Sequence, residues 1–265
     1  MVEEHVKQSF FKYILKGKIL MTSVIELLRS HRSIRSFEDK KIPEDLLVDI
    51  LLAGQAAATS SLIQASSIIR VTDPKLREKL CEVGGGQAYI KDAPEFLVFC
   101  ADLNRASRCC EMYDETPIKG LTEHFIIATV DVALVAQNIV IASESSGLGI
   151  CYIGALRNNP SKVCEILRLP GNVYPVFGLC IGFPAQNPEI KPRLPLEVLV
   201  KENFYDAMSE DKLIKKYDRE LNKYYESRSL NNKMSVWSEQ MSEKLSKESR
   251  AHMKEFLNKR SFLLR

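Results

Sequence analysis

The stretch TEHFIIATVDVALVAQNIVIASESSGLGICYIG, residues 122–154, carries the strongest structural signal in the chain. Its apolar residues recur at helical spacing, at Phe125, Ala128, Val132, Val135, Ile139 and Ala142. Gly147 and Gly149 end this pattern, and the strand-like run ICYIG follows directly. The stretch therefore predicts a long helix over residues 122–146 at the centre of the core, followed by a buried strand.

Helices and strands alternate on both sides of this stretch. Apolar periodicity and helix-starting residues predict helices over residues 43–58, 74–83 and 159–169, with Asp73 capping the second. Runs rich in Ile, Val and Phe predict strands over residues 66–73, 96–102 and 173–183. Four prolines in FPAQNPEIKPRLP, residues 183–195, predict an extended loop, and residues 210–225 and 237–259 have helical spacing.

These elements make a mixed helix-and-strand domain without the regular strand–helix alternation of a Rossmann fold. The motifs GxGxxG, GxxxxGK[ST] and GxSxG are all absent from the sequence, which removes the main support for P-loop nucleotide binding and for a hydrolase nucleophile. Motif-bearing sequence begins at a second methionine, Met21. We therefore expect one domain over residues 21–265. Residues 1–20 are either an extension outside the fold or a weakly amphipathic helix.

Composition narrows the class of protein. The 265 residues are 45% hydrophobic and 27% charged, with a formal net charge of +3, so disorder is excluded and any anion site must be local. Residues 1–20 carry scattered charges, unlike an export signal. Seven cysteines without a CxxC pair, including the adjacent Cys109 and Cys110, predict free thiols and a cytoplasmic protein. The four histidines are too scattered for paired metal spacing, so no metal site is proposed.

Two short basic clusters are candidate phosphate sites. The first is His31-Arg32-Ser33-Ile34-Arg35, and the second is Lys191-Pro192-Arg193 within the proline-rich loop. The planar guanidinium group of arginine suits paired hydrogen bonds to a phosphate. Taken alone, a cluster of this kind is more often a solvated basic segment at the surface than a phosphate site. Acting together, they would give one phosphate several cationic partners.

Other segments suit a planar, polar ligand. Residues 59–64, TSSLIQ, offer hydroxyl and amide groups after a helix, although a capping turn explains them equally well. Residues 84–87 and 147–157 contain glycines that let a ligand approach the backbone, but glycine in a turn usually means only a turn.

Eight motifs in a fixed order show a resemblance. They are HRSIRSF, SSLIQASSIIRVTD, GGQ, FCADLNR, GLGICYIGALRNNP, PVFGLCIGFPAQNPEIKPRLP, YYESRSLNN and KESR, spread between residue 21 and the C-terminus. The chain resembles the bacterial oxygen-insensitive NADPH nitroreductases, including their NADPH–FMN oxidoreductase members. The resemblance implies an α+β fold with a mixed central sheet flanked by helices, in an interlocked homodimer with two FMN sites at its interface.

The resemblance also assigns residues to noncovalent FMN. The phosphate and ribityl chain would contact His31, Arg32, Ser33, Arg35, Lys191 and Arg193. The ribityl hydroxyls and ring would contact Ser60, Ser61, Gln64 and Gln87, and the ring would lie beside Tyr152, Ile153, Gly154, Ala155 and Arg157. NADPH or substrate would meet Arg228, Lys233, Lys247, Arg250 and Leu62. No side chain is assigned as a catalytic group, because the flavin performs the hydride transfer.

The implied activity is two-electron, ping-pong reduction of nitroaromatics, quinones or free flavin by NADPH, without nucleic acid or membrane partners. Four departures from the family pattern stand out: Leu62, Ala155, Lys233 and residues 105–119. Leu62 and residues 105–119 bear on substrate range, whereas Ala155 is a small steric change. One alternative is a flavin-dependent reductive dehalogenase of the same superfamily. A much weaker one is a nucleic-acid-binding module using the C-terminal helices, where acidic residues interrupt any basic stripe.

Overall fold

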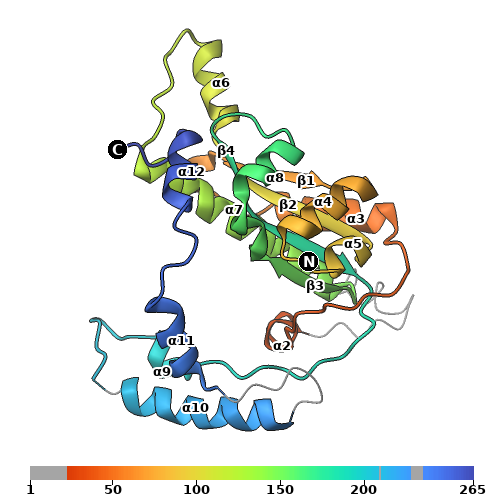
Figure 1. The fold of residues 1–265 in the computed structure, drawn as a ribbon, viewed down its shortest axis with the longest axis vertical. Coiled ribbons are helices and arrows are strands. Elements are labelled where there is room, and N and C mark those ends of the chain that lie inside the picture. The colour runs from red at the N-terminus through yellow and green to blue at the C-terminus, as the bar shows by residue number, and fades with distance from the viewer. Residues whose placement is uncertain (1–22, 209, 228–234) are drawn as a thin grey trace, which may run out of the picture.

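The computed structural model describes residues 23–208, 210–227 and 235–265. Four antiparallel strands form its sheet in the order β1-β2-β4-β3 (Figure 1). They are β1 (Ser66–Arg70), β2 (Glu95–Asp102), β3 (Gly149–Ile153) and β4 (Val173–Gly182). All four lie within or at the predicted strand segments, so the strand predictions are confirmed. The resemblance implied a mixed sheet, whereas these four strands pair antiparallel throughout, and the parallel pairing beside them is the bridge between Ser33 and Ile150.

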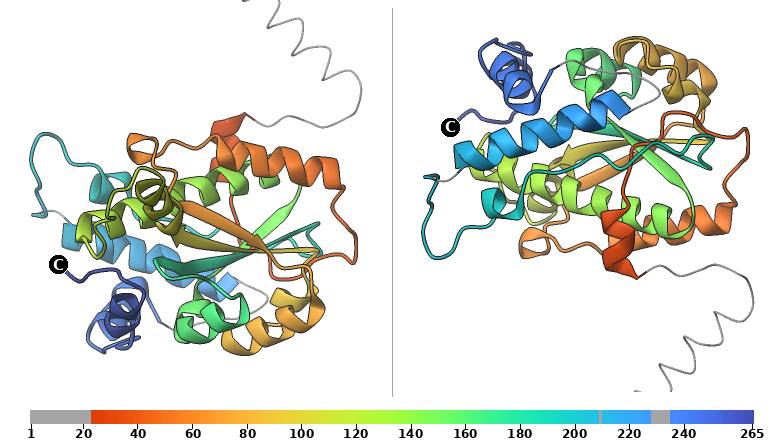
Figure 2. Two further views of the ribbon diagram at one scale, coloured as in Figure 1. Left: turned by 90° about the horizontal axis from the view of Figure 1, so that it is seen from above. Right: turned by 90° about the horizontal axis from the view of Figure 1, so that it is seen from below.

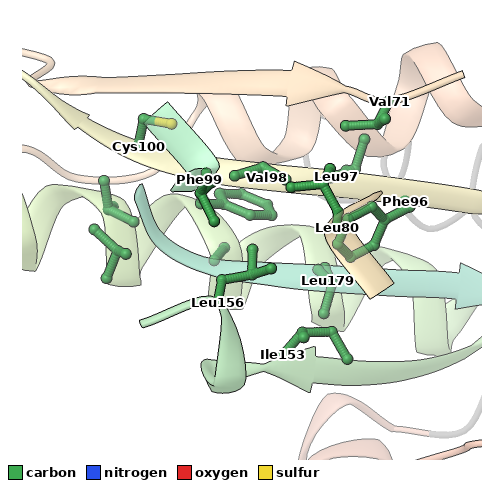
Figure 3. Close-up of a cluster of buried hydrophobic side chains, with 14 of the residues drawn as sticks. Val71, Leu80, Phe96, Leu97, Val98, Phe99, Cys100, Ile153, Leu156 and Leu179 are labelled. Carbon is green, nitrogen blue, oxygen red and sulfur yellow. The ribbon is translucent and has the colours of Figure 1, made fainter. Parts of the chain in front are cut away.

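The two central strands are buried along nearly their whole length. Phe96, Phe99 and Leu179 are fully inaccessible to solvent and lie in the cluster of apolar side chains drawn in Figure 3. A strand covered on both faces needs apolar residues at successive positions, which explains the unbroken runs FLVFCA and VYPVFGLCI. These runs made the strands predictable.

Helices cover both faces of the sheet (Figure 2). Helices α3 (Glu44–Gln55) and α7 (Thr122–Ser145) pack on one another and on one face. Helices α4 (Pro74–Val83) and α8 (Pro160–Ile166) lie on the other face. A side chain caps the start of each helix: Asp73 accepts a hydrogen bond from the Lys75 N–H, and Asn159 accepts one from the Lys162 N–H. The predicted helices in these regions are confirmed.

The predicted central helix is α7. Ala128, Val132 and Ile139 of this helix are fully buried, and Ile139 lies against Gly54 of α3. Among the described residues it is also the single helix that is long and apolar enough to cross a membrane by length and composition. Its packing on the sheet and on α3 is that of a core helix.

The C-terminal part forms a second layer of helices. Helices α9 (Leu196–Leu199), α10 (Glu210–Ser227) and α11 (Trp237–Leu245) lie to one side of the sheet, and α12 (Met253–Lys259) returns to it (Figure 1). Tyr217, Leu221 and Tyr225 of α10 form a small core of their own with Trp237. The helix predicted over residues 210–225 is confirmed.

Two segments add detail that the sequence pattern did not give. Residues 237–259, which have helical spacing, form two helices, because the chain turns at residues 246–252, where Arg250 adopts a left-handed φ of 57°. Residues 104–112 form a helix, α6 (Asn104–Met112), within a segment predicted only as a divergent loop. The short helices α2 (Val24–Arg29) and α5 (Tyr89–Asp92) complete the fold.

All seven cysteines are free, as predicted. Five are buried: Cys81, Cys100, Cys151, Cys164 and Cys180. Cys109 is exposed and Cys110 partly exposed on α6, without a bridge between them. The thiols therefore act mainly as small core side chains.

Candidate functional site

The first basic cluster lies along the edge of the sheet. Ser33 forms a parallel bridge with Ile150 of β3, and the Ile34 N–H donates to the Ile150 carbonyl at 2.8 Å. Gly149 permits this close approach, because a Cβ atom there would lie 2.5 Å from Cγ1 of Ile34. Residues 31–35 are thereby fixed beside the strand that leads to residues 152–157.

Pairing between two distant segments brings the second cluster to the first. Phe37 bridges Pro184, the Glu38 N–H donates to the Phe183 carbonyl at 2.9 Å, and the Ala185 N–H donates to the Ser36 carbonyl at 3.0 Å. The chain after β4 therefore runs past residues 31–35 before it enters the proline-rich loop, which has no helix or strand over residues 188–195, as predicted.

Aromatic residues of α10 support this loop. The Tyr217 hydroxyl donates to the Pro192 carbonyl at 3.0 Å, and the Tyr224 hydroxyl donates to the Glu189 carbonyl at 3.4 Å. The ammonium group of Lys191 lies 5.6 Å from the centre of the Tyr225 ring. The second layer of helices thus sets the position of both cations in the loop.

Both basic clusters line one cavity of about 510 Å³. Its lining consists of His31, Arg32, Ser33, Arg35, Pro188, Glu189, Lys191, Arg193, Tyr224 and Tyr225. Three guanidinium groups, one ammonium group and a hydroxyl on a stiff backbone suit a phosphate ester, and the single carboxylate does not cancel them. The residues present therefore fit the phosphate end of FMN.

A carboxylate on α7 lies behind the cavity. Glu144 accepts a hydrogen bond from Nδ1 of His31. Its charge also adds to burial in raising the pKa of Tyr152 to about 12. The Tyr152 phenol therefore keeps its proton further into the alkaline range than an ordinary tyrosine does, and it is available as a hydrogen-bond donor.

The segment predicted beside the flavin ring continues from this strand. Tyr152 packs edge-on against Phe177 with ring centres 5.0 Å apart, and the 3₁₀ helix η2 (Gly154–Asn158) follows. Arg157 donates to the Val176 carbonyl at 2.6 Å. Gln87, which was also predicted to contact the flavin, is not among the residues that line the cavity.

The C-terminal segment of the same chain docks on η2. Arg250 donates twice to the Asn158 carboxamide oxygen, at 3.1 Å, and His252 lies 3.0 Å from the Arg157 carbonyl. Arg250 is therefore close to the predicted ring segment, whereas Lys247 is exposed in the turn before it. Arg228 and Lys233 lie outside the described residues.

The predicted flavin residues of the 59–65 loop lie far from the two basic clusters in the structure. Thr59 and Ser60 bond to Asp131 of α7, while His31 bonds to Glu144 of the same helix, thirteen positions further on. At 1.5 Å per residue, these two contact points are roughly 20 Å apart along the helix. The predicted grouping of Ser60, Ser61, Gln64 and Leu62 with the basic clusters is therefore not formed within one chain.

A second, more open cavity of about 1070 Å³ lies beside the 59–65 loop. Thr59, Leu62, Ile63 and Gln64 line it together with apolar residues of α3 and β1. Among the residues that the structure describes, none lines both cavities.

Sequence reasoning missed several residues of the first cavity. Pro188, Glu189, Tyr224 and Tyr225 line it, and Glu144 supports it from behind. The repeated tyrosines on one face of α10 were a usable signal for loop contacts. Glu144 had no such signal, because a polar residue near a helix end is ordinarily solvated.

Comparison with known proteins gives an independent result. The profile of the nitroreductase family matches residues 28–183, and that of the nitroreductase family C-terminal domain matches residues 191–265. The chain is 44% identical to the oxygen-insensitive NADPH nitroreductase of Salmonella typhimurium, over 92% of this chain and all of that protein. It is 43% identical to the NADPH-flavin oxidoreductase of Vibrio harveyi, with the same coverage.

A solved structure extends the similarity to the fold. Nitroreductase A from Vibrio parahaemolyticus superimposes with a TM-score of 0.86 at 42% identity, over 92% of this chain and 100% of that one. The sequence matches span nearly the whole chain and the fold agrees, so the chain belongs to the nitroreductase family.

Proposed function

We propose that this protein is an FMN-dependent oxidoreductase that uses NADPH to reduce nitroaromatic compounds, and also quinones or free flavin, in two-electron steps. The observation that carries the proposal is the 510 Å³ cavity in which Arg32, Arg35, Lys191 and Arg193 converge from two distant segments. The names of the Salmonella nitroreductase, the Vibrio harveyi oxidoreductase and a Bacillus subtilis FMN reductase (NADPH) that is 38% identical support the choice of cofactor and reductant.

In this proposal the chain binds and orients the reacting groups. FMN, when bound, supplies hydride transfer, which no side chain of the site can perform. The basic clusters hold the phosphate through charge-assisted hydrogen bonds. Tyr152, Gly154 and Arg157 would lie along the ring, with Tyr152 as a neutral phenol.

We also propose a homodimer in which each FMN site uses two copies of the chain. The 59–65 loop, held roughly 20 Å from the His31 contact along α7, then reaches the cavity of the second copy. Apolar side chains exposed on α3 and α7 suit the covered face of such a dimer: Val48, Leu52, Ile126, Val130 and Leu134. We place the protein in the cytoplasm, consistent with seven free thiols.

Activity tests the chemical proposal. The purified chain is expected to be yellow, and NADPH is expected to bleach the flavin before an added nitroaromatic restores its colour. A halogenated aromatic serves as the comparison substrate for the dehalogenase alternative. Faster flavin reoxidation by the halogenated compound, with release of halide, would replace the nitroreductase assignment.

Mixed dimers test the shared site. One chain carries Arg32→Ala and Lys191→Ala, the other carries Ser60→Ala, Ser61→Ala and Gln64→Ala, and two different tags isolate the mixed pair. If the loop serves the second copy, one site of the pair combines both defects and the other is intact. One tight FMN per dimer is then expected. If each chain builds its own site, both sites are defective and no tight FMN remains.

A further inference from the structure

A buried carboxylate in the middle of α7 holds the 59–65 loop. Asp131 is 1% exposed and accepts from the Thr59 hydroxyl at 2.5 Å, the Ser60 N–H at 3.1 Å and the Ala65 N–H at 3.0 Å. An ionised carboxylate accepts hydrogen bonds and donates none, and all three partners are donors. One side chain of the core helix therefore ties both ends of the loop.

Further hydrogen bonds extend this attachment inside the loop. The Thr59 hydroxyl accepts from the Gln64 N–H at 2.9 Å, so Thr59 links Gln64 to Asp131. From the opposite side, Arg105 of α6 donates to the Gln64 carbonyl at 3.0 Å. The loop is thus fixed at both of its ends and at Gln64.

The loop held in this way has an unfavourable backbone. Ser61, Leu62 and Gln64 have φ values of 48°, 57° and 52°, in the left-handed region that residues with a Cβ atom seldom adopt. Glycine would relieve the strain, yet none occurs between Gly54 and Gly84. The Leu62 side chain is 74% exposed, so its conformation does not serve the core of this chain.

Strain at exposed residues, together with a buried charge, indicates a loop shaped for a ligand. Burying a carboxylate without a cation costs free energy that a plain connection between α3 and β1 does not need to spend. Strained backbone held by its surroundings is a known feature of binding sites. The side chains presented by this loop are those assigned to flavin and acceptor: Ser60, Ser61, Leu62 and Gln64.

We propose that Asp131, acting through Thr59, is the positioning residue that sets the 59–65 loop for FMN and acceptor binding. This role rests on the proposed function, because it requires that the loop meet a flavin. Asp131 itself touches neither ligand. It fixes the backbone from which the contacting side chains project.

Matched threonine substitutions test this role in the full-length protein. Thr59→Val keeps the side-chain shape and removes both hydroxyl bonds, whereas Thr59→Ser keeps the hydroxyl. Thr129→Val is the control. Thr129 lies on α7, the helix that carries Asp131, but its hydroxyl bonds to Tyr174 and to the Phe125 carbonyl and not to the loop. The FMN Kd is measured by fluorescence quenching, and acceptor KM and kcat by steady-state kinetics.

Thr59→Val is expected to raise the FMN Kd roughly tenfold, because it loses one hydrogen bond to a charged group. It is also expected to raise the acceptor KM more than it lowers kcat. Asp131→Asn is expected to act in the same direction. Thr59→Ser and Thr129→Val should leave the Kd within about twofold of wild type. Helix content by circular dichroism should match wild type in all four.

The positioning role is overturned if Thr59→Val binds FMN as tightly as wild type, or if Thr129→Val weakens binding as much. The second result would trace the effect to general destabilisation. A wild-type protein that fails to bind FMN would overturn the proposed function and this role with it, so the two failures are told apart by the wild-type titration.

Discussion

His31 and Glu144 form a hydrogen bond of 2.6 Å between Nδ1 and Oε1, joining the first basic cluster to the C-terminal end of α7. The carboxylate side chain is largely buried, with 12% of its surface exposed. Because a carboxylate can only accept, the Nδ1 atom carries the proton in this pair. Glu144 thus fixes the orientation of the imidazole that lines the cavity.

This relationship predicts the effect of Glu144→Gln. The amide keeps the size of the side chain but gives up the charge-assisted bond, so the imidazole is held less firmly. The FMN Kd should rise by about threefold to tenfold, measured by fluorescence titration, while the unfolding midpoint changes little. Glu165→Gln, on the exposed face of α8, is the control, and an equal effect of both changes would argue against a specific role for Glu144.

A second prediction concerns the contact between Gly149 and Ile34. A methyl group at Gly149 would overlap Ile34, so Gly149→Ala should lower the free energy of unfolding by about 1–3 kcal/mol in urea. Gly171→Ala is the matched control, since a Cβ atom there meets nothing within 4 Å. Equal stability of the two variants would show that the strand edge and residues 31–35 are not packed this closely.

Thiol reactivity gives a third prediction. Burial raises the pKa of Cys81, Cys100, Cys151, Cys164 and Cys180, which lowers their thiolate fraction at a given pH. Iodoacetamide in mildly alkaline buffer should therefore label at most Cys109 and Cys110 in the folded protein, as read by mass spectrometry. All seven should react after denaturation. Labelling of Cys100 or Cys180 in the native state would contradict the packing of the central strands.

A fourth prediction concerns NADPH and Arg228, which lies outside the described residues. The planar guanidinium group suits the 2′-phosphate that distinguishes NADPH from NADH. Arg228→Ala should cost roughly 2–4 kcal/mol of transition-state stabilisation with NADPH and little with NADH, in stopped-flow reduction of the bound flavin. Equal losses with both nucleotides would show that Arg228 does not contact the 2′-phosphate.

Local patterns in the sequence were sufficient for most of the fold. The apolar runs of β2 and β4 and the capping residues Asp73 and Asn159 act within a few residues, so their elements were predictable. The break after α11 was not, because residues 246–252 contain neither glycine nor proline. Docking of Arg250 on Asn158 accompanies the turn there, and such a contact between distant residues leaves no local pattern.

In the candidate site, too, the local sequence features were predictable and the contacts between distant segments were not. Each basic cluster was visible in the sequence, but their convergence depends on the pairing of residues 36–38 with residues 183–185. The positions of Ser60 and Gln64 could not be predicted, because the Asp131 carboxylate lies about seventy positions away in the chain. It bonds to Ser60 directly and is linked to Gln64 through Thr59. Their separation from the basic clusters became visible only in the structure.

The most direct test of the account is the FMN affinity of the variant that carries both Arg32→Ala and Lys191→Ala. Each side chain is expected to make charge-assisted bonds to the phosphate worth ~1.5–3 kcal/mol, so the pair should weaken binding by roughly two to four orders of magnitude. Wild type should purify with flavin absorbance, and the double variant without it. A double variant that retains full FMN occupancy would contradict the assignment of the cavity.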